Sequence, residues 1–176
     1  MAEIDTIREY NGKKPVIPKS CKIFENCSIY GNVVFGENCV VMPNCVIRAE
    51  SGKITIGDGT NIQDLTCIHT DTYDGADVYI GKETTIGHRA LLHACTIGDK
   101  ALIGMGATVL NGAVVKNGAM VAAGALVTQN AVIEEGMLAV GVPAKVKRPV
   151  SDFEKKDIEE TIEEYRLISE EYLKED

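Results

Sequence analysis

The three histidines of the chain, His69, His88 and His93, all lie in one short central stretch of the sequence. Neutral imidazole is the commonest protein ligand for transition metals. Three imidazoles with a fourth position left for water are typical of a catalytic zinc site, whereas a structural zinc site has four protein ligands. The residue types therefore indicate a catalytic metal site, provided that the three side chains converge in space.

Apolar residues recur every six positions through most of the chain. The series comprises Ile29, Phe35, Val41 and Ile47, then Ile56, Ile62 and Ile68, then Ile80, Ile86 and Leu92, and finally Ile97, Ile103, Val109, Val115, Val121, Val127 and Ile133. The residue four positions after each is usually small, and glycines such as Gly98 fall where tight corners are expected. A hexapeptide period is typical of a parallel β-helix. We therefore predict an all-β domain over residues 1–150, a triangular prism in which positions eighteen apart stack.

Two segments depart from this repeat. Residues 71–77, which include Asp71 and Asp74, exceed one smooth coil and are expected to form a protruding acidic loop beside His69. From Ser151 a capping box is followed by apolar residues at spacings of three and four, which predicts a C-terminal amphipathic α-helix over residues 151–176, packed on the prism.

Composition narrows the range of partners. The net charge of −8 comes mostly from residues 151–176, so the body is nearly neutral and has no basic stripe that could bind nucleic acid or an anionic membrane. The acidic start does not resemble a secretory signal, and no stretch is apolar enough to span a bilayer. We expect a cytoplasmic protein with reduced cysteines.

The six cysteines divide into two groups. Cys21, Cys27, Cys39 and Cys45 fall on the small inward positions of the repeat, where free cysteine packs as a small apolar residue. Cys67 and Cys95 lie close in sequence to histidines, so a ligand or redox role stays open for them, although neither belongs to a CxxC pair.

The repeat also places the histidines. Each follows an inward residue by one or two positions, so all three should lie near corners with their side chains directed outward. His88 and His93 are only five residues apart and fall on neighbouring corners, too far apart to bind one ion within a single prism. A complete site therefore needs a second subunit, which predicts a cyclic oligomer with sites at its interfaces.

The chain resembles the gamma-class carbonic anhydrases and their close homologues. The stretches that carry the resemblance are Val46-Ile47-Arg48, Thr60-Asn61-Ile62-Gln63-Asp64, Ile68-His69, Thr85-Ile86-Gly87-His88, Leu92-His93-Ala94-Cys95, Ile103-Gly104-Met105-Gly106-Ala107 and Gly141-Val142-Pro143-Ala144-Lys145. The resemblance implies a left-handed β-helix, a homotrimer and the reversible hydration of carbon dioxide to bicarbonate by metal-activated water. Zinc is the expected metal, with iron or cobalt as alternatives.

The same resemblance assigns individual roles. His69 and His93 would come from one chain and His88 from its neighbour. Gln63 would position the reacting water, and Arg48 and Asp64 would form ion pairs that support the interface and orient the ligands.

The chain also departs from the best-studied members of that family. Their Arg-Gly-Asp-Glu is here Arg48-Ala49-Glu50-Ser51, and Thr72 replaces a glutamate proposed to shuttle protons. Asp71 and Asp74 offer substitute carboxylates, and Arg89 adds a cation beside His88. Turnover is therefore expected to be slow.

Two other functions stay open. A hexapeptide-repeat acyltransferase or acyl-CoA thioesterase would need only one histidine, as a general base, and no metal. A non-catalytic trimeric scaffold would explain the missing shuttle glutamate. Acyl transfer leaves two of the three histidines unexplained.

Overall fold

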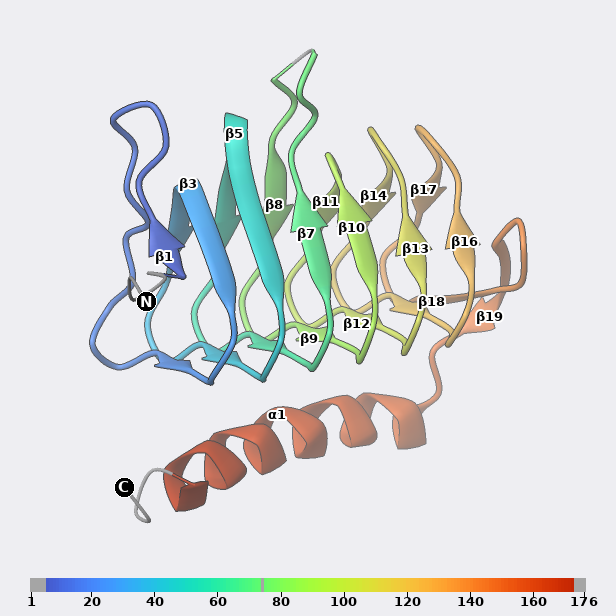
Figure 1. Cartoon of the computed structure of the whole chain (residues 1–176). Coiled ribbons are helices and arrows are strands. Elements are labelled where there is room, and N and C mark those ends of the chain that lie inside the picture. The colour runs from blue at the N-terminus through green and yellow to red at the C-terminus, as the bar shows by residue number, and fades with distance from the viewer. Residues whose placement is uncertain (1–5, 74, 173–176) are drawn as a thin grey trace.

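The computed structural model describes residues 6–73 and 75–172. The chain winds into a left-handed parallel β-helix of about seven turns, followed by one α-helix (Figure 1). The predicted fold class is therefore confirmed. Short parallel strands stack in register from coil to coil along three faces of the prism.

Each face is a column of stacked strands. The first face contains β1 (Ile7–Arg8), the first halves of β3 (Ser28–Phe35) and β5 (Val46–Ile56), β7 (Cys67–His69), β10 (Leu91–His93), β13 (Thr108–Val109) and β16 (Leu126–Val127). The second contains the remaining halves of β3 and β5, then β8 (Val78–Ile80), β11 (Thr96–Ile97), β14 (Val114–Val115) and β17 (Val132–Ile133). The third contains β2 (Lys22–Ile23), β4 (Val40–Val41), β6 (Asn61–Ile62), β9 (Thr85–Ile86), β12 (Leu102–Ile103), β15 (Met120–Val121), β18 (Met137–Val140) and the antiparallel β19 (Lys145–Pro149).

The predicted inward ladder forms the core. Residues of the six-residue series such as Ile47, Ile68 and Leu92 are completely buried, and so are small partners such as Ala107. All six cysteines are free thiols. Cys27, Cys39 and Cys45 are buried in this core, as predicted, whereas Cys21 is only partly buried against its edge.

The structure shows why a corner position such as Gly98 requires glycine, which the sequence pattern alone does not explain. At Gly98 an added Cβ would lie 2.4 Å from the Asn117 Oδ1 atom and 2.6 Å from the Asn117 nitrogen, because the next coil passes directly beneath it. The Asn117 side chain occupies that space since its Oδ1 accepts a hydrogen bond from the Asp99 N–H, at 3.0 Å. Left-handed backbone occurs at other corner positions, such as Gly118 with φ 60°.

Gly98 is packed against the next coil and Gly118 is not, so replacing each with alanine should lower the free energy of unfolding by different amounts. Gly98→Ala forces a side chain against the backbone of the next coil, so we expect it to lower the free energy of unfolding by roughly 3 kcal/mol, the upper end of the range for overpacking. Gly118→Ala meets no atom within 4 Å and should cost only about 1 kcal/mol, for its left-handed backbone. Urea denaturation of both variants tests this. Equal losses would contradict the packing explanation.

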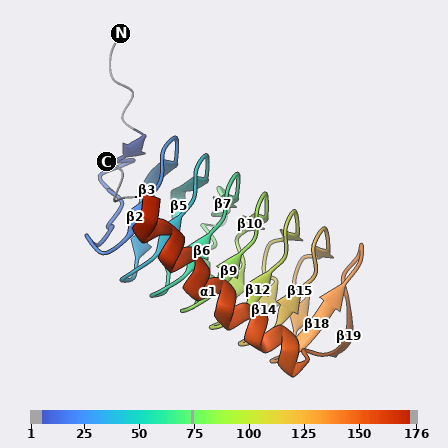
Figure 2. The same cartoon turned by 90° about the horizontal axis from the view of Figure 1, so that it is seen from below.

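The C-terminal helix α1 (Asp152–Tyr172) runs back along the prism (Figure 2) and contacts β4 and β9 on the third face. Its first turn contains the predicted capping box: the Ser151 N–H donates to the Glu154 carboxylate at 2.8 Å, and the Glu154 N–H donates to the Ser151 Oγ at 3.3 Å. Ile158 and Ser169 are buried against the prism. Among the described residues, no helix is long and apolar enough to cross a membrane.

The segment between β7 and β8 protrudes beyond the corner of the prism, as predicted (Figure 1). At its base the Asp71 N–H donates to the Ala76 carbonyl oxygen at 3.1 Å, and Tyr73 near its tip is almost fully exposed. Asp74, one of the two acids considered above, lies outside the described residues.

Candidate functional site

Strand register brings two of the three histidines together. Arg48 in β5 pairs with His69 in β7, and His69 pairs with His93 in β10, so the three residues stack on the first face in successive coils. The His69 Nδ1 and His93 Nε2 atoms are 3.1 Å apart, and the two rings meet edge to face with centroids 5.0 Å apart. The structure thus brings these two side chains together within one chain.

The outer nitrogen of each ring faces an acceptor. The His69 Nε2 lies 3.0 Å from the Glu50 Oε2, and the His93 Nδ1 lies 2.8 Å from the Asn111 Oδ1. Asn111 Nδ2 donates to Asp71, which fixes the amide with its oxygen towards His93. Arg48 donates to Glu50 at the other end. The result is a continuous row of side chains from Arg48 to Asp71 with the two histidines at its centre.

Charge states follow from these surroundings. Burial tends to raise the pKa of Glu50, but the hydrogen bond and charge of Arg48, with hydrogen bonds from the backbone and His69, together hold that pKa below its ordinary value. Glu50 is therefore a carboxylate at neutral pH. Burial, and then the charge of Arg48, lower the pKa of His69, which favours the neutral imidazole.

The proton positions follow in turn. A carboxylate only accepts hydrogen bonds, so a neutral His69 carries its hydrogen on Nε2, towards Glu50. By the same argument a neutral His93 carries its hydrogen on Nδ1, towards the Asn111 oxygen. The two remaining nitrogens, His69 Nδ1 and His93 Nε2, then direct lone pairs at each other. Such a pair is stable when a cation lies between them.

The pair fits a metal ion. Two nitrogens bound tetrahedrally to zinc at its usual bond length lie about 3.3 Å apart, close to the 3.1 Å between His69 and His93. An acceptor on the far ring nitrogen is also the usual arrangement around a metal-bound histidine, because it fixes the tautomer and the ring orientation. Within the described residues, no group of three or more His, Cys, Asp and Glu side chains is placed to hold one ion.

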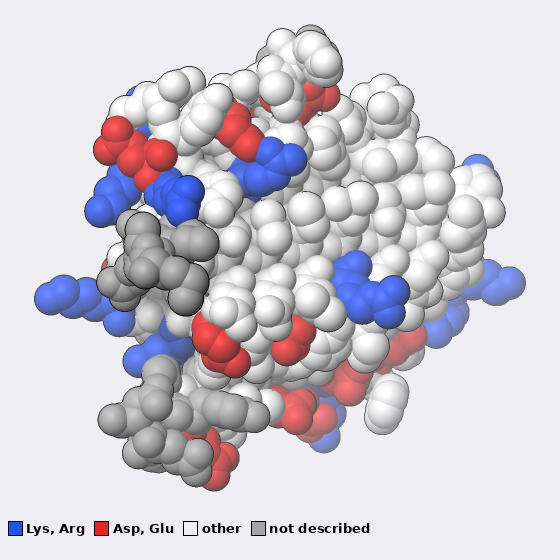
Figure 3. Space-filling model, in the orientation of Figure 1, with Lys and Arg blue, Asp and Glu red and all other residues white. Residues whose placement is uncertain are grey.

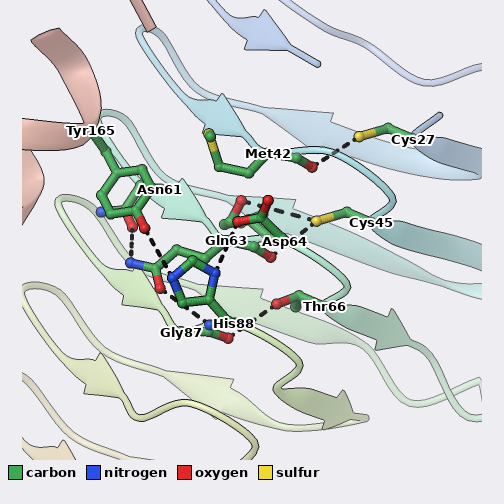
Figure 4. A network of polar contacts seen from close by, with 11 residues as sticks. Cys27, Met42, Cys45, Asn61, Gln63, Asp64, Thr66, Gly87, His88 and Tyr165 are labelled. Atoms are coloured by element: carbon green, nitrogen blue, oxygen red, sulfur yellow. Dashed lines mark hydrogen bonds and ion pairs between the residues drawn. The ribbon is translucent and has the colours of Figure 1, made fainter. Parts of the chain in front are cut away.

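His88 belongs to a second group, at the end of β9 (Figure 4). Its Nδ1 lies 2.9 Å from the Asp64 Oδ2, and its backbone N–H donates to the Gln63 Oε1 at 3.1 Å. Its Nε2 faces the hydroxyl of Tyr165 from α1 at 3.2 Å. The Asp64 carboxylate thus leaves the His88 Nε2 as the acceptor nitrogen, the same pattern as in the histidine pair.

The candidate residues therefore fall into two groups in one chain. Arg48, His69 and His93 form one, and Gln63, Asp64 and His88 form the other. In the part of the chain that the structure describes, no hydrogen bond, ion pair or ring contact joins His88 to His69 or His93. Within the chain Arg48 pairs with Glu50, and Asp64 pairs with His88.

Sequence reasoning missed three participants. Asn111 follows His93 by eighteen residues, but β10 and β13 pair with an offset of seventeen, Leu91 with Thr108, so the stacking rule does not identify it. In sequence Glu50 is only a departure from a motif, and Tyr165 is only one residue of the predicted helix over residues 151–176. Asp71, a substitute carboxylate for the missing glutamate by its position in the sequence, accepts hydrogen bonds from the Tyr73 N–H and the Asn111 amide and thereby orients Asn111.

The two cysteines near the histidines are poor ligand candidates. Burial raises the pKa of Cys95 to about 12 and also raises the pKa of Cys67. A thiol must lose its proton to bind a metal or to react as a nucleophile. Cys67 and Cys95 are therefore expected to stay protonated at neutral pH.

Comparisons with known proteins identify the family. A family model described as "Bacterial transferase hexapeptide (six repeats)" matches residues 94–129. Among solved structures, a hexapeptide transferase family protein from Anaplasma phagocytophilum is 39% identical, with a TM-score of 0.88 over 93% of this chain and 96% of that chain. A Bacillus cereus protein, provisionally named an acetyltransferase, is 36% identical, with a TM-score of 0.90 over 94% and 95% of the two chains.

A more distant similarity points the same way. A hexapeptide-repeat acetyltransferase from Vibrio cholerae is 26% identical, with a TM-score of 0.54 over 66% of this chain and 73% of that chain. No curated protein matches the chain. Since the first two similarities extend over almost the whole of each chain, the protein belongs to the hexapeptide transferase family.

Proposed function

We propose that this protein is a metal-dependent enzyme whose sites lie between the subunits of a homotrimer, and that its reaction is the hydration of carbon dioxide. The observation that carries the proposal is the 3.1 Å approach of His69 Nδ1 to His93 Nε2, with an acceptor facing the other nitrogen of each ring. A third imidazole, His88 of a neighbouring chain, would complete the ligand set. Zinc, iron or cobalt bound there would make water nucleophilic at neutral pH.

The residues of the chain have separate tasks in this proposal. Glu50 and Asn111 hold the tautomers of His69 and His93. Asp64 holds that of His88, whose Nε2 would have to exchange the Tyr165 hydroxyl for the ion. Gln63 contacts the backbone of His88 and would enter the shared site with it, where its amide could orient the reacting water.

The first face supports the subunit contact. Figure 3 shows that the front of the prism, over β7, β10, β13 and β16, carries few charged side chains. Leu65, Leu91 and Met105 are exposed along this part of the prism and its edge. Surfaces with exposed apolar and few charged residues are typical of subunit interfaces. A trimer that covers this face would bring a neighbouring chain next to the histidine pair.

Acyl transfer or acyl-CoA hydrolysis is the second candidate, and the comparisons favour it over hydration. The relatives from Bacillus cereus and Vibrio cholerae are named acetyltransferases, and the Anaplasma protein is named a transferase. The Glu50–His69 contact would suit a general base that takes a proton from an acceptor hydroxyl or amine. This reaction uses one histidine and leaves the role of the other two unexplained.

Metal analysis combined with two activity assays distinguishes the candidates. We expect protein purified without air to be a trimer with one zinc or iron per chain, and its carbon dioxide hydration to disappear on chelation and return with added metal. A trimer that neither contains metal nor acquires it on reconstitution would refute the metal-dependent enzyme. Bound metal with acyl-CoA hydrolysis but no hydration would establish the second candidate instead.

The acceptor behind His93 provides a separate prediction. Asn111→Leu removes the oxygen that fixes the His93 tautomer, so we expect zinc affinity to fall by about 10- to 100-fold, the usual effect of losing such a partner. Gln129→Leu, one coil further along the same column, is the matched control and should leave affinity unchanged. Competition with a metal-binding dye measures both. Equal affinity in the two variants would show that Asn111 does not orient the ligand.

A further inference from the structure

Two pairs of cysteines stack between adjacent coils at the N-terminal end of the prism. Cys21 precedes Cys39 by eighteen residues, and Cys27 precedes Cys45 by the same number. The registers are parallel: the Lys22 N–H donates to the Cys39 carbonyl and the Ser28 N–H to the Cys45 carbonyl, both at 2.8 Å. Stacked strands are separated by about 4.8 Å, which is within the range of Cα separations that a disulfide spans.

The sulfur atoms of the first pair contact the same carbonyl oxygen. The Sγ atoms of Cys21 and Cys39 lie 3.0 Å and 3.6 Å from the same acceptor, the Gly36 carbonyl oxygen. Cys21 is partly exposed, whereas Cys39 is completely buried. One sulfur is therefore accessible to a reagent in solution, and a second thiol lies directly behind it.

The protonation states match this asymmetry. The hydrogen bond from Cys39 lowers the pKa of Cys21 to about 7, against the opposing effect of burial. The contact with Cys21, and then burial, raise the pKa of Cys39. At neutral pH the accessible sulfur is thus partly thiolate, the form that reacts with oxidants, and the buried one is a thiol.

We propose that Cys21 and Cys39 are a peroxide-sensitive pair that closes to an intrachain disulfide. The Cys21 thiolate attacks one oxygen of hydrogen peroxide, which breaks the O–O bond, releases hydroxide and leaves Cys21 as a sulfenic acid. The Cys39 sulfur then displaces the sulfenic oxygen, forming the S–S bond, and the Cys39 proton leaves with that oxygen as water. A dithiol reductant reverses the change by exchange, returning both thiols.

The second pair is the internal control. Cys27 and Cys45 have the same spacing and the same stacking, but both are buried, at 2% and 0% exposure. Their sulfurs donate to different carbonyl oxygens, those of Met42 and Gln63. A peroxide molecule in solution therefore reaches Cys21 and not Cys27, although all four cysteines occupy equivalent positions of the repeat.

Peptide mapping of the folded protein tests this proposal. The protein is treated with a small excess of hydrogen peroxide, remaining thiols are alkylated, and peptides are separated without reduction. Trypsin frees Cys21 in the peptide Ser20–Lys22, and cleavage after Glu37 separates Cys27 from Cys39. We expect one disulfide per chain, joining Cys21 to Cys39. It should persist in Cys27→Ser, disappear in Cys21→Ser and be replaced in Cys39→Ser by a sulfenic acid that dimedone traps at Cys21.

Three results would overturn the proposal: a first disulfide at Cys27, a bond between chains, or thiols that all survive peroxide. Thermal unfolding followed by circular dichroism shows whether each variant remains folded. Cys39→Ala is a second variant if Cys39→Ser does not fold, because it removes the resolving thiol without placing a hydroxyl in the core.

Discussion

His93→Ala is expected to give a folded protein that no longer retains metal and has lost its metal-dependent activity. The change removes one of three proposed ligands and leaves the lone pair of His69 without its partner at 3.1 Å. Loss of a ligand should exceed the effect of losing an outer partner, so we expect metal affinity to fall by more than 100-fold. Metal content after gel filtration and the hydration and acyl-CoA assays measure the result.

The fold itself should not depend on this histidine. His93 lies on the outside of the prism and is only partly buried. Circular dichroism and thermal unfolding of the metal-free variant should therefore be nearly the same as for the metal-free wild type. Val132→Ala is the control, since Val132 is an exposed residue of β17 on the second face, away from the proposed interface. Full metal content in His93→Ala would contradict the proposed site.

Trimers that contain both His93→Ala and His88→Ala chains are expected to regain metal and activity that neither variant has alone. Neither His93→Ala nor His88→Ala should be active alone. When the two variants are expressed together, some interfaces pair an intact histidine pair on one chain with an intact His88 on its neighbour. Random assembly of equal amounts makes about a quarter of the interfaces complete, as expected for sites shared around a cyclic trimer. Metal content and activity should therefore recover to about that fraction.

The same mixture distinguishes shared from separate sites. If all three histidines of one chain formed one site, every chain in the mixture would carry a defect and no activity would return. Chains with different affinity tags allow the mixed trimers to be isolated first, so that a failure to mix is not mistaken for a negative result. Isolated mixed trimers without metal would contradict the interface site.

Much of the fold could be predicted because the six-residue period fixes which side chains point inward. Ile68 and Leu92 are fully buried, and once that register is known their neighbours His69 and His93 must lie outside and stack. The role of Gly98 could not be predicted, because it depends on the Asn117 side chain of the following coil, and a local pattern does not show what passes beneath a corner.

The candidate site was predictable to the same extent. Convergence of the histidine pair follows from register, but the position of Asn111 does not, because β10 and β13 pair with an offset of seventeen residues and not eighteen. Tyr165 is different, because it reaches His88 from a helix whose position along the prism is set by packing and not by the repeat. No spacing in the sequence relates these two residues.

The contact between Tyr165 and His88 couples the docking of α1 on the prism to metal binding at the subunit interface. The tyrosine hydroxyl occupies the Nε2 atom of His88, the same atom that a shared ion would need. Whatever free energy this hydrogen bond contributes to docking of α1 is therefore subtracted from metal affinity, and by reciprocity a bound ion weakens the attachment of α1 by an equal amount. Loading of the interface should then be visible at a distance, as faster amide exchange in the C-terminal helix.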